Sequence, residues 1–286
     1  MAGTLATYAY PVFGELPVQA IDTELVLRAI EPIWMTKPET ASRLRGRIES
    51  VIGWAATKGY RQPGENPARW KDHLENLLPA KSKVRRVEHH AALPYAEIAA
   101  FMAELRRQEG VGAQALEFAI LTAARTGEVI GARWDEINLA ERLWVIPAAR
   151  MKAGKEHRVP LSDPAMAIVE AMSALRQGDF MFPGGKARRP LSNMALLMTL
   201  RRMGRDDLTA HGFRSSFSDW CAERTAYPSE VREMALAHAV GDKVEAAYRR
   251  GDLFEKRRDL ADAWAAHCAG SVGGMVVQLR APALMS

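Results

Sequence analysis

The chain has 286 residues, enough to bury a sizeable core and to form two domains. Hydrophobic residues make up 48% of it, and no run of about 18 apolar residues could span a membrane. The N-terminus also lacks the basic region and apolar core of a secretory signal. The net charge is +5 and the sequence pI is about 9.3, which permits a nucleic-acid partner. These features predict a cytoplasmic protein.

Cysteine content and short motifs exclude several other classes. The chain has two cysteines, Cys221 and Cys268, and no C-x-x-C, so we expect two reduced thiols rather than a disulfide framework or a zinc site. It has neither G-x-x-x-x-G-K-[ST] nor G-x-G-x-x-G, the motifs typical of nucleotide cofactors. The pair His89-His90 is more typical of a polar linker than of a metal site, and Asp206-Asp207 of a helix cap. The sequence therefore predicts no cofactor and no metal.

The first 80 residues contain two apolar patterns with a helical period. Residues 1 to about 36 predict an irregular start, followed by a short helix that Asp22-Thr23 caps and that ends at Ile30. Residues 39–57 predict an amphipathic helix. Its apolar stripe consists of Leu44, Ile48, Val51, Ile52 and Ala55. A further short helix is expected to begin at Asn66-Pro67.

Positive charge is concentrated in the same region. Residues 37–88 contain 12 Lys/Arg and 6 Asp/Glu, an excess of 6, whereas the whole chain has a net charge of +5. Arg43, Arg47 and Lys58 lie with Trp54 on one face of the 39–57 helix, which is either a solvated basic face or a DNA contact. Residues 81–90 read K-S-K-V-R-R-V-E-H-H and predict a linker, either a plain tether or one that binds phosphates. Its basic residues are Lys81, Lys83, Arg85 and Arg86.

The rest of the chain predicts helices around one β-hairpin. L-W-V-I-P and H-R-V-P-L predict two strands, with Gly154 in the turn between them. Helices are expected over 94–108, 112–124, 163–175, 213–224, 229–237, 242–249 and 253–268, and another begins at 192. Residues 270–286 show no helical period and predict a flexible tail. The expected fold class is mainly α with a small antiparallel β-sheet (α+β).

Six residues form an ordered set. His211 and Arg214 occur in L-T-A-H-G-F-R, three apart as on one helix face. His238 follows, and Tyr248 comes ten residues after it. Upstream, A-A-R-T-G-E contains Arg125. Taken singly, such residues are usually packing, capping or surface residues. In chain order the set is Arg125, Lys152, His211, Arg214, His238 and Tyr248, with Glu128 close to the first.

This set resembles the tyrosine recombinases, the phage-type integrases, over about residues 93–268. The motif R-T-G-E, the H-G-F-R box and L-F-E-K-R-R after Tyr248 are most similar to integrases of satellite phages and genomic islands. The resemblance implies a helical core DNA-binding domain over 1–88, ending in the basic linker 81–90. A catalytic domain over 91–269 and a flexible tail over 270–286 would follow. Many such integrases carry a further arm-binding domain, so we expect this chain to be N-terminally incomplete.

The resemblance also implies the chemistry. Arg125 and Arg214 would bind the non-bridging oxygens of a DNA phosphate, as guanidinium groups match them in geometry and charge. Tyr248 would attack the phosphorus and form a 3′-phosphotyrosine bond, so that neither a metal nor ATP is needed. His211 would be the base and Lys152 the general acid, with Lys155 as the alternative. His238 would donate to the phosphate, and Glu128 would either orient basic residues or cap a helix.

The implied function is a site-specific DNA recombinase that integrates or excises a prophage or genomic island. Its partners would be double-stranded DNA with attachment sites, three further copies of itself in a tetramer, a host DNA-bending factor and an excision factor, all at the nucleoid. Arg201 and Arg202 would add DNA contacts.

Alternatives remain open at this point. One is a truncated element-derived DNA-binding protein without productive integration, and another is DNA relaxation of the type IB topoisomerase kind. A metal-dependent nuclease is disfavoured. The helix over 253–268 would pack either on its own domain or on a neighbouring protomer.

Overall fold

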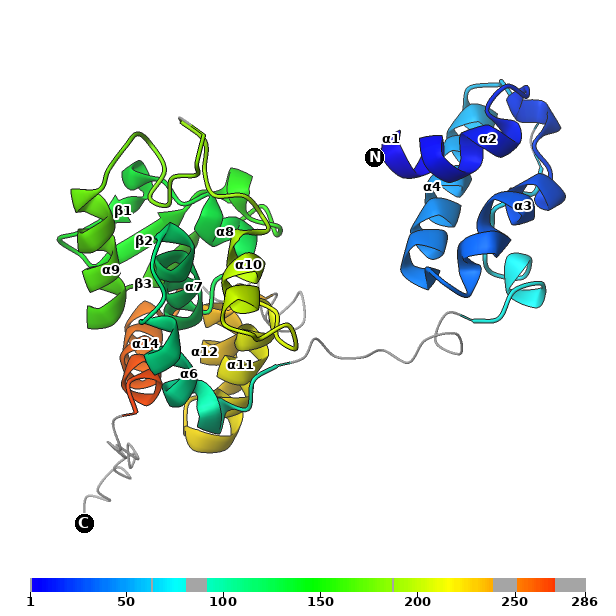
Figure 1. Ribbon diagram of the computed structural model, residues 1–286. Coiled ribbons are helices and arrows are strands. Elements are labelled where there is room, and N and C mark those ends of the chain that lie inside the picture. Colours follow the sequence, from blue (N-terminus) through cyan, green and yellow to red (C-terminus); the bar gives the residue numbers. More distant parts are fainter. Residues whose placement is uncertain (1, 63, 81–91, 187, 239–250, 271–286) are drawn as a thin grey trace, which may run out of the picture. The chain divides into compact units, whose positions relative to one another are not determined.

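The computed structural model describes residues 2–62, 64–80, 92–186, 188–238 and 251–270 (Figure 1). The chain divides into two compact units, Met1–Glu88 and His89–Ser286, which are described separately. Both are mainly helical, and the second contains a three-stranded antiparallel sheet, so the predicted fold class is confirmed. Among the described residues, no helix is both long and apolar enough to cross a membrane.

The first unit begins with helical turns rather than the irregular segment that was predicted. Its elements are α1 (Ala2–Thr4), η1 (Leu5–Ala9), α2 (Tyr10–Phe13), η2 (Val18–Ala20), α3 (Thr23–Trp34), α4 (Pro38–Thr57) and η3 (Leu74–Asn76). The early turns form because Ala9 and Phe13 are buried against the rest of the unit. The cap of α3 is as predicted, since the Asp22 carboxylate accepts from the Leu25 N–H at 2.9 Å. The helix continues past Ile30 to Trp34.

The core of the first unit lies between α3 and α4. Ile30 and Leu44 are fully buried there, and the rings of Trp34 and Trp70 stack with centroids 5.4 Å apart. Two predictions are wrong. Val51 is 49% exposed, because α4 is covered on a narrower face than its apolar stripe suggests. Residues 66–78 form turns and the short η3 helix instead of an α-helix.

The sheet of the second unit consists of β1 (Ile137–Asn138), β2 (Leu143–Ile146) and β3 (His157–Pro160), in that order. Strands β2 and β3 pair from Leu143↔Pro160 to Ile146↔His157, which confirms the predicted hairpin. Gly154 lies in the turn between them with φ +63°, a conformation that glycine adopts without steric cost. The first strand is only two residues long, too short for a sequence pattern to indicate it.

The other elements of the second unit are helices. They are η4 (Tyr95–Glu97), α6 (Ile98–Leu105), α7 (Val111–Thr122), α8 (Thr126–Ile130), η5 (Trp134–Glu136), η6 (Ala148–Arg150), α9 (Asp163–Ala174), α10 (Ala195–Arg202), α11 (Gly212–Arg224), α12 (Ser229–Ala235) and α14 (Phe254–Cys268). Helix α7 is the central one, because it is buried on nearly every side. The helix predicted over 242–249 and the tail lie outside the described residues. Cys221 and Cys268 are free and buried.

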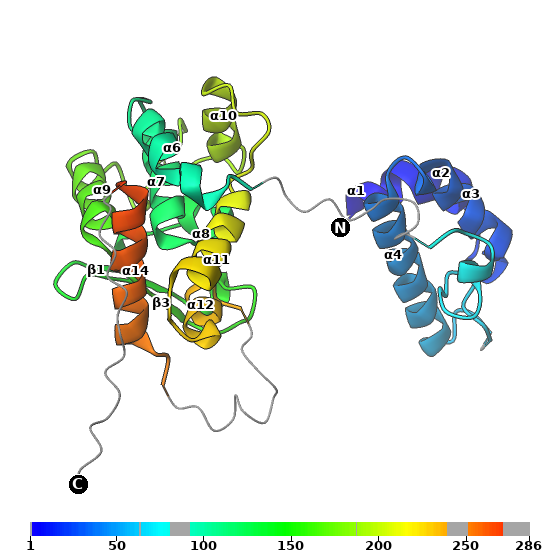
Figure 2. The ribbon, with the colours of Figure 1, turned by 90° about the horizontal axis from the view of Figure 1, so that it is seen from below.

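Helix α14 packs on its own unit, against α6, α7, α12 and β3 (Figures 1 and 2). Leu260, Trp264 and Cys268 are buried, and the Trp264 indole donates to the Ile120 carbonyl at 2.8 Å. Arg257, a charged residue of the same helix, is also only 2% exposed. The buried side chains of α14 thus pack on their own domain, which is the first of the two predicted alternatives.

This packing predicts the effect of shortening Trp264. We expect Trp264→Ala to lower the free energy of unfolding by about 3–5 kcal/mol, because a fully buried ring is replaced by a cavity. Urea unfolding followed by circular dichroism measures the loss. Leu139→Ala, at a side chain that is 55% exposed, is the control and should change stability by less than about 0.5 kcal/mol. Equal effects in the two variants would contradict the core role of α14.

Candidate active site

Arg214 occupies the first turn of α11 and is 5% exposed. Its Nη1 donates to the Ala123 carbonyl and its Nη2 to the Leu236 carbonyl, the latter at 2.6 Å. Burial, together with the like charge of Arg125, lowers the pKa of Arg214 to about 10. The guanidinium remains charged at neutral pH.

Arg125 lies between α7 and α8 and approaches one of these carbonyls, that of Leu236. Its Nη2 is 3.4 Å from the Leu236 carbonyl oxygen and 3.2 Å from that of Ala237. Glu128, 5% exposed, accepts from Arg125 Nη1 and from the Arg125 backbone N–H, both at 2.8 Å. Both predicted geometries for Glu128 are present, since it caps the start of α8 and also fixes the arginine side chain.

Two alanines in the left-handed backbone conformation orient the carbonyl groups that contact the two arginines. Helix α12 is followed, after its C-cap Leu236, by Ala237 at φ +49°. There the His238 N–H donates to the Glu233 carbonyl and the Ala237 N–H to that of Met234. This is the Schellman arrangement, in which glycine usually takes the left-handed position. Ala123 ends α7 with the same φ of +49°. Both helix ends therefore present partial negative charge to the two arginines.

His238 connects the arginines to a carboxylate. Its Nδ1 lies 2.8 Å from Glu233 Oε2, and its Nε2 lies 3.3 Å from Arg214 Nη2. The other oxygen of Glu233 accepts from Arg232 Nε at 3.1 Å. Burial raises the pKa of Glu233, but the hydrogen bonds from His238 and Arg232 outweigh burial and hold that pKa below its ordinary value. Arg125, Arg214 and His238 thus form one cluster with two fixed carboxylates.

The remaining predicted site residues are exposed or lie outside the described part of the chain. His211 is exposed and directly precedes α11, at its N-cap position. Lys152 and Lys155 are both exposed in the turn between β2 and β3, so the choice between them remains open. Tyr248 lies outside the described residues.

Four of the nine predicted DNA-contacting residues lie on described helices. Arg43 is exposed on α4 and pairs with Glu39, and Arg47 of the same helix donates to the Thr4 hydroxyl. Lys58 is exposed at the C-cap of α4. Arg201 and Arg202 are exposed in the last turn of α10. The linker residues Lys81, Lys83, Arg85 and Arg86 fall outside the described ranges.

The predicted helix cap at Asp206-Asp207 is wrong, because α11 begins only at Gly212 with His211 at its N-cap. The two carboxylates instead pair with Arg201 and Arg205. Within the described ranges, no group of three or more His, Cys, Asp or Glu side chains could hold a metal.

Besides Glu233, three supporting residues were missed by the sequence analysis. Arg150 Nη2 donates to the Glu128 carbonyl at 2.5 Å and its Nη1 pairs with Glu136, so it ties the hairpin to α8. His157 on β3 hydrogen-bonds to the Ala235 backbone, and burial, then Arg257, lowers its pKa to about 4. Arg257 donates to both the backbone and the carboxylate of Asp252. Arg150 could have been found from the sequence, because it lies two residues before the predicted site residue Lys152. His157 and Arg257 can be recognised only from the tertiary packing.

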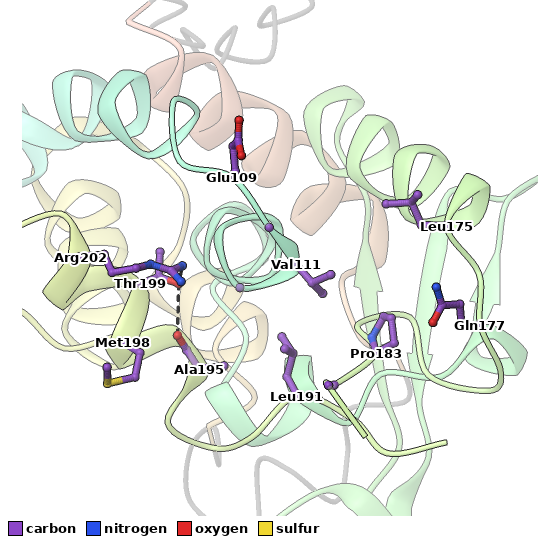
Figure 3. A pocket seen from close by; sticks show the side chains of 14 residues that line it. Glu109, Val111, Leu175, Gln177, Pro183, Leu191, Ala195, Met198, Thr199 and Arg202 are labelled. Carbon is purple, nitrogen blue, oxygen red and sulfur yellow. Dashed lines mark hydrogen bonds between the residues drawn. The ribbon is translucent and has the colours of Figure 1, made fainter. Parts of the chain in front are cut away.

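A cavity of about 460 Å³ is lined by none of the residues of this cluster, and Figure 3 shows the side chains that line it. It lies at the N-terminal end of α7, where Val111, Leu191 and Met198 line it and Arg202 donates to the Thr199 hydroxyl at 3.2 Å. The arginines contact the opposite end of α7, about 18 Å away along a helix of 12 residues. Geometry therefore favours the arginine cluster as the reactive centre.

Comparison with known families agrees with this cluster. Residues 92–252 match the model described as "Phage integrase family", and residues 1–73 match "Phage integrase central domain". The first match covers more than half of the chain and contains all six residues of the ordered set. The chain belongs to the phage integrase family, that is, to the tyrosine recombinases of the phage integrase type.

Several curated relatives come from one bacterium. The prophage integrases IntA and IntZ of Escherichia coli strain K12 are 31% and 35% identical over 94% and 92% of this chain. The chain spans 64% of the length of each.

Solved structures share the fold. The lambda integrase dimer bound to a COC′ core site has a TM-score of 0.61 at 16% identity and covers 85% of this chain and 92% of its own. The Tn1549 transposon integrase, in complex with a circular intermediate DNA, has a TM-score of 0.61 at 10% identity and 90% coverage of both chains.

The left-handed end of α12 generates a stability prediction. We expect Ala237→Gly to raise the free energy of unfolding by roughly 0.5–1 kcal/mol, because glycine adopts φ +49° without the steric cost of a Cβ. Ala235→Gly, two residues earlier and inside the helix, should instead lower it by about 0.5–1 kcal/mol. Thermal unfolding of the two variants measures both signs. A loss of stability in Ala237→Gly would show that the left-handed conformation is not strained.

Proposed function

We propose that this chain is a site-specific DNA recombinase that cuts and rejoins duplex DNA through a 3′-phosphotyrosine bond at Tyr248. The observation that carries the proposal is the pairing of Arg125 and Arg214 on one carbonyl, beside His238. Two guanidinium groups fixed in this way offer N–H donors to the non-bridging oxygens of a phosphodiester, where negative charge develops during attack. Membership of the phage integrase family supports the same reaction.

The reaction would proceed in two balanced steps. The Tyr248 oxygen attacks the phosphorus and its proton passes to His211, while the 5′-oxygen of the DNA leaves and takes a proton from Lys152, or from Lys155. The phosphate ester is conserved as a phosphotyrosine ester, so rejoining needs neither ATP nor a metal. The 5′-hydroxyl of a second strand then attacks this ester and gives its proton back to the lysine, while the Tyr248 oxygen leaves and takes its proton back from His211. His238 donates to the phosphate throughout.

The partners follow from the same proposal. The substrate would be double-stranded DNA carrying attachment sites, which the first unit would help to bind as a core-binding domain. A solved relative is described as a lambda integrase tetramer bound to a Holliday junction. We infer four copies of this chain on DNA, with a host bending factor and an excision factor as accessory partners. Integration or excision of a mobile element is the outcome that fits.

Covalent capture tests the proposal directly. Nicked duplexes with a randomised core trap a cleaved strand on the protein, and captured DNA is recovered after denaturation and sequenced. We expect wild-type protein to capture an enriched core sequence in EDTA, and Tyr248→Phe to bind that core without any covalent adduct, since only the nucleophilic oxygen is lost. Tyr227→Phe, in the same unit, is the control and should react normally. An adduct formed by the Tyr248 variant would refute the nucleophile, and capture without enrichment would indicate a topoisomerase.

A second prediction concerns α4. Arg43→Ala and Arg47→Ala should each reduce the slope of log binding constant against log salt by roughly 0.9, if each arginine contacts one phosphate. Arg28→Ala is the matched control, because Arg28 is exposed on α3 of the same unit and carries the same charge. Gel shifts with the captured core over a salt series give the slopes. A slope that stays unchanged in all three variants would leave α4 as a solvated face.

A further inference from the structure

His238 lies between a group that only accepts hydrogen bonds and a group that only donates them. The Glu233 carboxylate is 2.8 Å from its Nδ1, and an Arg214 Nη2 is 3.3 Å from its Nε2. An ionised carboxylate has no proton to give and a guanidinium has no lone pair to offer. The proton of the neutral ring must therefore be on Nδ1, and Nε2 must carry the lone pair.

A bound phosphate would reverse the requirement at Nε2. The non-bridging oxygens of a phosphodiester accept hydrogen bonds, as does the Nε2 lone pair, so the two cannot bond to each other. For His238 to bind a phosphate held by Arg125 and Arg214, its Nε2 must first gain a proton. The ring then becomes an imidazolium, and Nδ1 still donates to Glu233.

Charged groups around the ring make this protonation depend on the phosphate. Arg214 faces the ring from α11, Arg125 lies on the adjacent carbonyls, and Arg232 is on α12, so three guanidinium groups place positive charge near the ring. Glu233 opposes them directly, and Glu128 opposes them through Arg125. An incoming phosphate adds negative charge at the same place and shifts the balance towards imidazolium.

Glu233 is held so that it can act on the ring in both states. One of its oxygens accepts from Arg232 and the other from His238, while the Glu233 backbone carbonyl accepts from the His238 N–H at 2.9 Å. Carboxylate and imidazole are therefore fixed at both the side-chain and the backbone level by the end of α12. The His238 side chain is 44% exposed, so its proton can exchange with water.

We propose that Glu233 is a positioning residue that fixes the proton of His238 on Nδ1, and that phosphate binding at the two arginines is coupled to the uptake of one proton from water at Nε2. The inference rests on the proposed function, because the anion is taken to be a DNA phosphate.

Four variants separate charge from geometry. Glu233→Gln keeps an oxygen that accepts from Nδ1 but removes the negative charge, whereas Glu233→Ala removes both. His238→Gln removes the titrating ring. Glu223→Gln is the matched control, since that α11 carboxylate accepts from the Tyr95 hydroxyl at 2.8 Å and the substitution makes the same change in charge.

The first measurement needs no DNA. Nitrogen-15 spectra of protein labelled at histidine distinguish the tautomers, and His238→Gln identifies the signals of this ring. We expect Nδ1–H in the wild type and in Glu233→Gln, and a measurable share of Nε2–H in Glu233→Ala, because only the 3.3 Å contact of Arg214 with Nε2 then favours Nδ1–H. An Nε2–H tautomer in the wild type would overturn the assignment of Glu233.

The second measurement uses the core duplex recovered by covalent capture. Calorimetric titrations at about pH 8, above the ordinary range of histidine, in buffers of different protonation enthalpy should give uptake of roughly one proton by the wild type. Glu233→Gln and His238→Gln should take up clearly less, and Glu223→Gln the same as the wild type. Adduct formation by Glu233→Gln should be about tenfold slower at this pH and recover as the pH falls, which a mere loss of packing would not produce.

The outcomes are distinguishable. If the wild type captures no DNA, the proposed function fails, and the spectra alone decide whether Glu233 sets the tautomer. If the wild type captures DNA but its binding enthalpy does not depend on the buffer, the recombinase stands and proton uptake is wrong.

Discussion

The carbonyl of Leu236 accepts hydrogen bonds from both Arg125 and Arg214, so one backbone group joins two guanidinium groups of like charge. Placing two cations together in a largely buried position is unfavourable unless fixed negative charge offsets it. Glu128 supplies one full charge, and the ends of α7 and α12 supply partial charges. The cluster keeps a positive excess in a preorganised geometry, which is the requirement for stabilising a phosphate in its transition state.

This constraint accounts for features elsewhere in the second unit. Two helices must end at the cluster with their carbonyls turned inward, and each does so through an alanine in the left-handed region. That conformation costs on the order of 1 kcal/mol for a residue with a Cβ and is typical of functional sites. The rigid packing of α7 and α14 around Trp264 holds these ends in place, and Arg150 ties α8 to the hairpin.

The sequence was sufficient for the residue types of the site but not for their supports. Arg125, Arg214 and His238 are indicated by local motifs, and the structure brings them together. No local motif indicates Glu233, because its role depends on how the last turn of α12 closes on His238. An apolar stripe such as that of α14 shows which face is covered, but tertiary packing decides which partner covers it. Val51 of α4 belongs to an apolar stripe with a helical period but is exposed, so such a stripe can be wider than the face that is buried.

The backbone carbonyls orient the two arginines without using all of their N–H groups. A guanidinium has five N–H groups, and the bonds of Arg125 and Arg214 to the described residues involve only their terminal nitrogens. Each fork therefore has further N–H groups that these contacts do not use. His238 differs, because its Nε2 lone pair is directed at Arg214 and must be protonated before it can serve the same anion. Within one cluster, the arginines can donate to a phosphate as they stand, whereas the histidine can donate to it only after its Nε2 is protonated.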